Sequence, residues 1–108
     1  MTESQPSMIP PPEGAISDED FHAYIAVIRD ALLVHYDREQ SRQGLWKDYE
    51  AKDQANSIKV KVDRVVRSFE ILGRMGEDER DTREKIKTNV REELLDIINY
   101  ANFAARQL

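Results

Sequence analysis

Apolar side chains recur every three or four residues along most of this chain, which is the period of an amphipathic helix rather than of a strand. The first such segment follows Ser17, a residue type that caps helices, and its opening turn is acidic at residues 18–20, where the helix dipole favours negative charge. We expect a helix here with its apolar face buried. The residues of that face are Phe21, Ile25, Ile28, Leu32 and Tyr36.

Gly44 marks a break after this helix, because glycine adopts the backbone conformations that end helices. The next segment, residues 45–49, carries Trp46 and Tyr49 and is expected to be a loop or a short helix. A second long helix is predicted over residues 57–72. Its β-branched run could form a strand, but the spacing of its apolar stripe favours a helix. The stripe consists of Ile58, Val62, Val65, Phe69 and Leu72.

The last helix is predicted over residues 82–108, after a connection rich in glycine and charge. Its apolar stripe consists of Ile86, Val90, Leu94, Ile97, Ala101, Ala104 and Leu108. No stretch has convincing strand character. The predicted fold class is therefore all-α, a helical bundle of three long helices plus a short segment, completed by oligomerisation.

The N-terminal residues differ in composition from the rest. Residues 1–14 contain all four prolines, three of them consecutive, and little periodic apolar content. Such a segment favours an extended conformation without a packed core. We interpret residues 1–16 as a flexible proline-rich tail, with a docking peptide as the alternative, and residues 17–108 as a single all-α domain.

Composition narrows the possible functions. With 108 residues the core is small, so oligomerisation would bury further surface. A net charge of −5 argues against broad binding to nucleic-acid backbones. The absence of cysteine excludes disulfides and thiolate metal sites. Because there is no bilayer-length apolar run and no secretory signal, we expect an intracellular, cytoplasmic protein.

One line of polar residues on the last predicted helix suggests chemistry. Asn89, Glu93, Asp96 and Tyr100 follow steps of four, three and four, and the line borders the apolar stripe with Glu93 nearest its centre. Two carboxylates at this spacing can converge on one cation, and Mg²⁺ prefers such oxygen ligands. The alternative is an ordinary solvated pair. Glu92 and Asn99 lie farther round the helix and are expected to face solvent.

The segment VREELLDIINYANFA, residues 90–104, resembles the second acidic motif, ExxD, of the all-α NTP pyrophosphohydrolase superfamily, which includes MazG-like and dimeric dUTPase-like enzymes. The context LLDIINYA is most similar to a small phage and bacterial branch associated with nucleotide modification. IKVKVDRVVRSFEI, with Lys61 and Arg64, and the aromatic GLWKDY are similar to further segments of that branch.

This resemblance implies a function and a site. It implies a Mg²⁺-dependent pyrophosphohydrolase that acts on nucleoside triphosphates, expected to be modified or unmodified dNTPs, as a homodimer or homotetramer in a bacterial or phage-infected cell. Glu93 and Asp96 match the metal-binding and catalytic positions. The implied substrate-binding residues are Lys61, Arg64, Asn99, Tyr100 and Trp46.

The chain departs from the superfamily at the first acidic motif, ExxE on the preceding helix. That helix offers only Asp63 and Glu70, and both fall away from its apolar stripe. The first helix carries a possible substitute in His35 and Glu39. Glu50 and Asp53 also have the spacing of a carboxylate pair, in a segment whose conformation the pattern does not define.

Two other interpretations therefore stay open. The first is a nucleotide binder without hydrolysis, in which Lys61 and Arg64 contact phosphates directly. The second is a helical assembly or adaptor protein, in which Glu93 pairs with a basic residue such as Lys61, Arg64 or Arg91. The distinguishing feature is whether Glu93 and Asp96 face acids from another helix, or basic residues and solvent.

Overall fold

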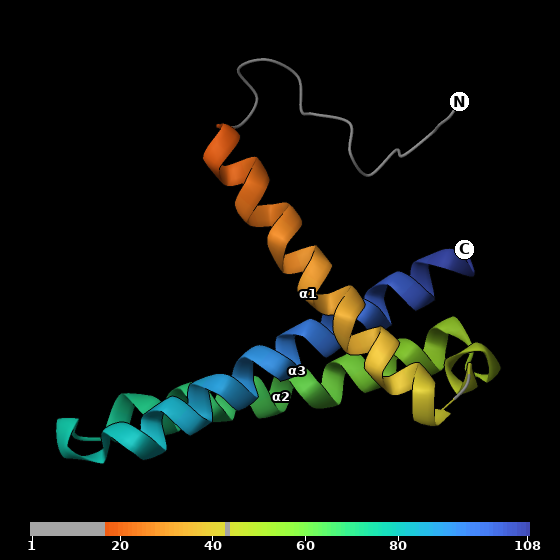
Figure 1. The fold of residues 1–108 in the computed structure, drawn as a ribbon. Helices are drawn as coiled ribbons and strands as arrows, with labels where there is room; N and C mark the ends of the chain where they lie inside the picture. The colour runs from red at the N-terminus through yellow and green to blue at the C-terminus, as the bar shows by residue number, and fades with distance from the viewer. Residues whose placement is uncertain (1–16, 43) are drawn as a thin grey trace.

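The computed structural model describes residues 17–42 and 44–108, so the interpretation of residues 1–16 as a tail lies outside the described residues. The elements, in chain order, are α1 (Asp18–Arg42), the short 3-10 helix η2 (Leu45–Asp48), α2 (Ala51–Arg74), the 3-10 helix η3 (Glu77–Glu79) and α3 (Arg80–Arg106) (Figure 1). No strand occurs among these residues. The prediction of an all-α fold with three long helices and a short segment is confirmed.

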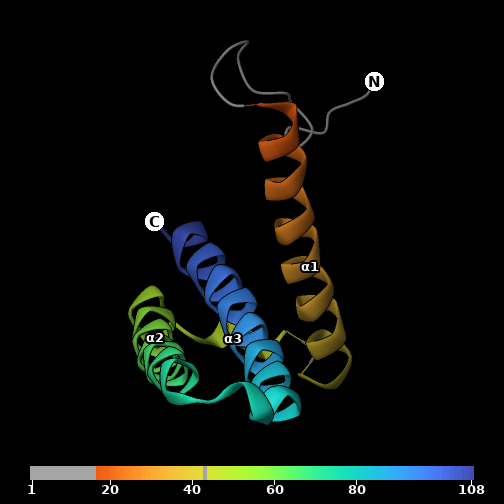
Figure 2. The same cartoon turned by 90° about the vertical axis from the view of Figure 1, so that its left-hand side faces the viewer.

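α2 and α3 form a long antiparallel hairpin, and α1 packs against α3 rather than against α2. In Figure 2 the three helices follow one another in the order α2, α3, α1. α1 crosses α3 with its C-terminal half, while its N-terminal half continues away from the hairpin (Figures 1 and 2). α3 is therefore the central helix, and both partners contribute side chains to its surface.

Local signals set where the helices begin and end. Ser17 Oγ accepts a hydrogen bond from the Asp20 amide at 3.1 Å, which confirms the predicted cap of α1. Gly44 has φ of 78°, in the left-handed region that glycine tolerates, and turns the chain into η2. α2 begins six residues earlier than predicted, where Asp53 Oδ2 accepts a hydrogen bond from the Glu50 amide at 3.1 Å. The pair Glu50 and Asp53 thus serves as a helix cap.

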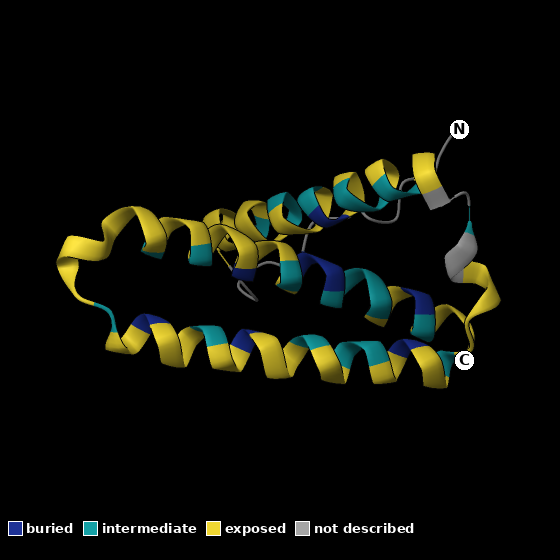
Figure 3. Ribbon diagram, turned by 90° about the horizontal axis from the view of Figure 1, so that it is seen from below, coloured by how far each residue is buried: buried dark blue, intermediate teal, exposed yellow. Residues whose placement is uncertain are grey.

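The buried core is small and lies along the facing sides of the helices (Figure 3). Its apolar members are Ala31, Val65, Leu72, Val90, Leu95 and Phe103. Val65, Leu72 and Val90 belong to the predicted stripes. Gln54 and Asp96 are buried among them, with 2% and 4% of their surfaces exposed. The hairpin interface is therefore partly polar at its centre.

The predicted apolar stripes were wrong in part. Several of their large members, which were expected to be buried, are 40–57% exposed, and Leu108 is fully exposed. The large members are Ile28, Leu32, Tyr36, Val62, Phe69 and Leu94. The physical reason is that the facing sides of α2 and α3 are partly polar: α2 turns Lys61 toward α3, and α3 turns Glu93 and Asp96 toward α2. No helix of the described residues is long and apolar enough to cross a membrane.

Candidate functional site

Asp96 is the centre of the polar line. Its side chain is 5% exposed, and Lys61 Nζ lies 3.0 Å from Oδ2. The guanidinium of Arg38 donates a hydrogen bond to the other oxygen, Oδ1. One carboxylate of α3 therefore pairs with a cation from α2 and with a cation from α1. A buried carboxylate is tolerated in a protein only with such partners, because the loss of hydration is large.

Glu93 lies one turn earlier on α3 and shares the same lysine. Its Oε1 is 3.4 Å from Lys61 Nζ and 3.8 Å from Arg64 Nη1. Its other oxygen, Oε2, is buried without a hydrogen-bond partner in the part of the chain that the structure describes. Glu93 was expected nearest the centre of the buried face, but Asp96 is the deeper residue, since Glu93 keeps a quarter of its side chain exposed.

Tyr100 continues the line toward the C-terminus of α3. Lys61 Nζ lies 5.9 Å from its ring centroid, at the outer limit of a cation–π contact. On its other side the ring meets Phe103 edge to face, with centroids 6.4 Å apart. Tyr100 thus lies between the charged cluster and an aromatic cluster formed with Phe103 and His35. The ring centroids of His35 and Phe103 are 5.0 Å apart.

Two cavities meet at this cluster. A cavity of about 210 Å³ lies where α1, α2 and α3 converge, and a larger one of about 560 Å³ lies along α2 and α3. Arg38, Asp96 and Tyr100 line both. The smaller cavity is lined mainly by aromatic rings and neutral polar groups, among them His35, Tyr49, Gln54, Ser57, Asn99 and Phe103.

The larger cavity carries most of the charge. Four cationic side chains and three carboxylates line it, a small positive excess in a chain whose net charge is −5. The cations are Arg38, Lys61, Arg64 and Arg67, and the carboxylates are Glu92, Glu93 and Asp96. Arg64 is the least engaged of the paired cations, with 63% of its side chain exposed and its partner oxygen 3.8 Å away. This cavity can receive an anionic group.

The donor set does not fit a resident Mg²⁺ in this arrangement. Glu93 Oε2 is an acceptor that a cation could satisfy, which favours a metal. However, the remaining oxygens of Glu93 and Asp96 pair with Lys61 and Arg38, and these positive groups repel a divalent ion. Over residues 17–42 and 44–108 no group of three or more His, Cys, Asp or Glu side chains gathers to replace the missing first motif. The magnesium site stays a prediction from the resemblance.

The other predicted site residues have diverse surroundings. Asn99 was expected to face solvent, but its Nδ2 donates a hydrogen bond to the carbonyl of Ala31 at 2.8 Å and so ties α3 to α1. Trp46 belongs to η2, and its side chain lies outside the described part. His35 and Glu39 line the smaller cavity, whereas Asp63 and Glu70 are exposed on α2, as expected.

Arg38 is the functional candidate that the sequence interpretation missed. It lies seven residues after Ala31, which places it two turns further along the buried side of α1. That spacing could be read from the sequence, but the apolar face expected for α1, which includes Ile28 and Leu32, lies on a neighbouring side of the helix. The role of a charged residue on this side can be inferred only when its partner is known, and here the partner is Asp96, 58 residues away in the sequence.

Comparison with protein-family models, curated proteins and solved structures found no match for this chain. The assignment of function therefore depends on the residues and contacts described above.

Proposed function

We propose that this domain binds a nucleotide, with the phosphates in the larger cavity between α2 and α3. The observation that supports this best is the cationic cluster built around Lys61. Two carboxylates of α3 hold that lysine in place, at 3.0 and 3.4 Å, while Arg64 beside it stays largely exposed. Arginine presents a planar fork of donors that matches phosphate oxygens, and lysine adds a compact charge.

The carboxylates act as positioning groups in this proposal. Asp96 and Glu93 neutralise part of the charge of Arg38 and Lys61 and fix where both cations point. A phosphate then meets cations that are already oriented, so less side-chain freedom is lost on binding. The smaller cavity, with its aromatic rings, lies next to the phosphate site and offers apolar surface for the rest of the ligand.

Binding without hydrolysis is the version that the contacts favour. Phosphoryl transfer needs charge neutralised at the reacting phosphate and a positioned nucleophile. In metal-dependent enzymes carboxylates supply this by holding ions, and here the two carboxylates of α3 already pair with cations. The hydrolase that the resemblance implies is therefore the alternative, and it requires Arg38 or Lys61 to leave Asp96.

Calorimetry with a panel of unmodified and modified dNTPs, together with a pyrophosphate-release assay, tests this proposal. We expect measurable binding whose affinity falls as the salt concentration is raised, because the contacts are ionic. We expect no release of pyrophosphate with or without Mg²⁺. Release of pyrophosphate would establish the hydrolase instead. No binding of any dNTP at millimolar concentration would eliminate the nucleotide function.

The assembly or adaptor function has two supporting observations. Glu93 and Asp96 face the basic residues Lys61 and Arg64 rather than a group of acids, which is the arrangement that this function predicts, while Arg91 pairs with Asp30 instead. Many large apolar side chains on α1 and α2 are exposed. Single exposed apolar residues are normal on a protein surface, but a continuous apolar face marks a contact surface. This function is compatible with nucleotide binding, because the exposed apolar residues of α1, such as Ile28 and Leu32, do not line either cavity.

A further inference from the structure

The side of α1 that packs on α3 continues past the end of the contact. α1 meets α3 from Asp30 and Ala31 onward, and its N-terminal half projects beyond the hairpin (Figures 1 and 2). Tyr24, Val27 and Ile28 precede Ala31 by seven, four and three residues, so they lie on the same side of the helix. They are 70%, 40% and 43% exposed. Among the residues that the structure describes, no other segment covers these side chains, and we call this N-terminal half of α1 the arm.

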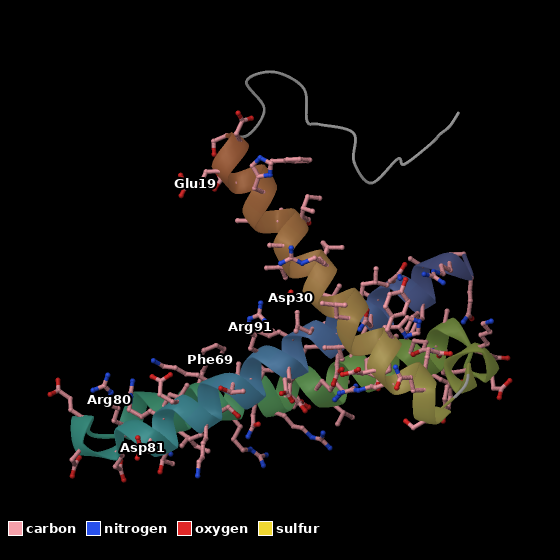
Figure 4. All side chains as sticks on the ribbon, viewed as in Figure 1. Glu19, Asp30, Phe69, Arg80, Asp81 and Arg91 are labelled. Atoms are coloured by element: carbon pink, nitrogen blue, oxygen red, sulfur yellow. The ribbon has the colours of Figure 1, made fainter. Side chains whose placement is uncertain are left out.

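The hairpin has an uncovered apolar face of its own. Val62, Val66 and Phe69 follow each other on α2 at steps of four and three and are 40%, 53% and 55% exposed. They lie beside the buried position Val65, on the flank away from the cationic cavity, which none of the three lines. Figure 4 shows Phe69 on the hairpin, away from the crossing point marked by Asp30 and Arg91.

We propose that a second copy of this chain covers both faces. The α1 arm of one protomer, taken as Tyr24, Val27 and Ile28 together with Leu32 one turn after Ile28, packs on the α2 face of its partner, defined by Val62, Val66 and Phe69. The partner returns the same contact. A two-fold exchange of this kind is closed, because each protomer supplies one arm and one face and none is left over.

The chain itself favours a second copy over an unrelated partner. The two uncovered faces lie on different elements and differ in shape, one a helix arm and the other a helix flank in a hairpin. A different protein would need two separate apolar surfaces to cover them, whereas a second copy carries both in the required number. Helix-on-helix packing also matches the spacing of both faces, which follow the three- and four-residue steps of interlocking helices.

The area is sufficient for a stable dimer. From their fractional exposure, the seven side chains of the arm and the face present on the order of 700 Å² per protomer. A standard protein interface buries roughly 800 Å² per partner. The two reciprocal contacts together therefore approach the size of a specific interface, and their neighbours on both helices add to it.

Sedimentation velocity on the full chain tests the assembly. We expect a dimer or a higher even oligomer, and we expect Ile28→Glu and Phe69→Glu each to shift the chain to monomer. Both positions are exposed within one chain, so the helical content should be retained in circular dichroism. Leu33→Glu and Val60→Glu are the matched controls, since these residues are 54% and 51% exposed on the opposite sides of α1 and α2. A monomeric wild-type chain, or an oligomer that neither variant weakens, would overturn the proposal.

Disulfide trapping tests which surfaces meet. The chain has no cysteine, so each introduced thiol is unique. Chains with Tyr24→Cys or Ile28→Cys are mixed with chains carrying Val62→Cys or Phe69→Cys and then oxidised. We expect cross-linked heterodimers from at least one such mixture and none from Leu33→Cys paired with the same α2 variants. Efficient cross-linking of the α1 variants with themselves would show an arm-to-arm dimer and refute the exchange.

Discussion

The ammonium of Lys61 lies 3.0 Å from Asp96 Oδ2, with only 14% and 5% of the two side chains exposed. The same ammonium is 3.4 Å from Glu93 Oε1. A single cation of α2 thus joins two carboxylates of α3 inside the hairpin, and Arg38 closes the arrangement from α1. Charged groups at the centre of so small a core contribute little net stability compared with apolar side chains of the same size. The cluster is the group on which the proposed phosphate site depends.

The substitution Asp96→Asn tests how strongly this centre is coupled. It removes the charge that pairs with both Arg38 and Lys61 and leaves the largely buried lysine with Glu93 alone. We expect the free energy of unfolding, measured by urea denaturation, to fall by about 3 kcal/mol, because removing one partner from a buried ion-pair cluster is strongly unfavourable.

Asp30→Asn is the control for that measurement. Asp30 also pairs with an arginine across α1 and α3, Arg91 at 2.7 Å, but both side chains are partly exposed, at 31% and 56%. Solvent screening limits such a pair to less than about 1 kcal/mol. Equal losses for the two variants would mean that burial of the Asp96 cluster has no energetic importance.

The helices were predictable because their signals are local. The cap at Ser17, the glycine turn at Gly44 and the spacing of apolar residues each act within a few positions of the chain. The buried sides were predicted less well. Ile28 and Phe69 fit an apolar stripe as well as Val65 does. Only the way in which the helices cross decides that Val65 is buried while Ile28 and Phe69 stay exposed.

Part of the candidate site could be predicted from the sequence. The helical spacing placed Glu93 and Asp96 on one line at the edge of the core, and Lys61 was considered as a partner for Glu93. The depth of Asp96 and the role of Arg38 could not be read in this way, because both depend on a contact between residues 58 positions apart. Whether the facing groups were acids or bases required the tertiary arrangement.

Glu93→Gln tests the magnesium prediction. Because Lys61 and Arg64 already neutralise this carboxylate, we expect millimolar Mg²⁺ alone to leave the melting temperature of both the wild type and the variant unchanged. The variant should differ in stability by less than about 1 kcal/mol, since it loses an ion pair and also loses a buried, unpartnered oxygen charge. Stabilisation of the wild type by Mg²⁺ that Glu93→Gln abolishes would favour the hydrolase.

Arg64→Ala tests the phosphate site. Arg64 is largely exposed and contributes one long ion pair, so its loss should hardly affect folding. We expect the affinity for a dNTP, and for inorganic triphosphate, to fall about tenfold in calorimetry, since a charged hydrogen bond contributes about 1.5 kcal/mol or more.

Arg29→Ala is the matched control. Arg29 has a similar side-chain exposure of 68% and pairs at long distance with Asp30, but it lies on α1 and lines neither cavity. Its substitution should leave the affinity unchanged. If both arginine variants weaken binding equally, the effect is a general one of net charge and the phosphates do not occupy the α2–α3 cavity.

Asn99→Ala tests whether this residue acts on the ligand or on the fold. Its side chain donates to the Ala31 carbonyl at 2.8 Å and is one of the few polar ties between α3 and α1. We expect faster hydrogen exchange at the amides of α1 from residue 31 onward, unchanged exchange over the outer half of the hairpin, and a loss of about 1 kcal/mol in stability. Asn102→Ala is the control, because Asn102 is exposed and contacts only Arg106 of its own helix, at 3.4 Å, among the interactions described here. A variant that loses dNTP affinity while α1 exchanges as in the wild type would show that Asn99 contacts the nucleotide, as the sequence resemblance implies.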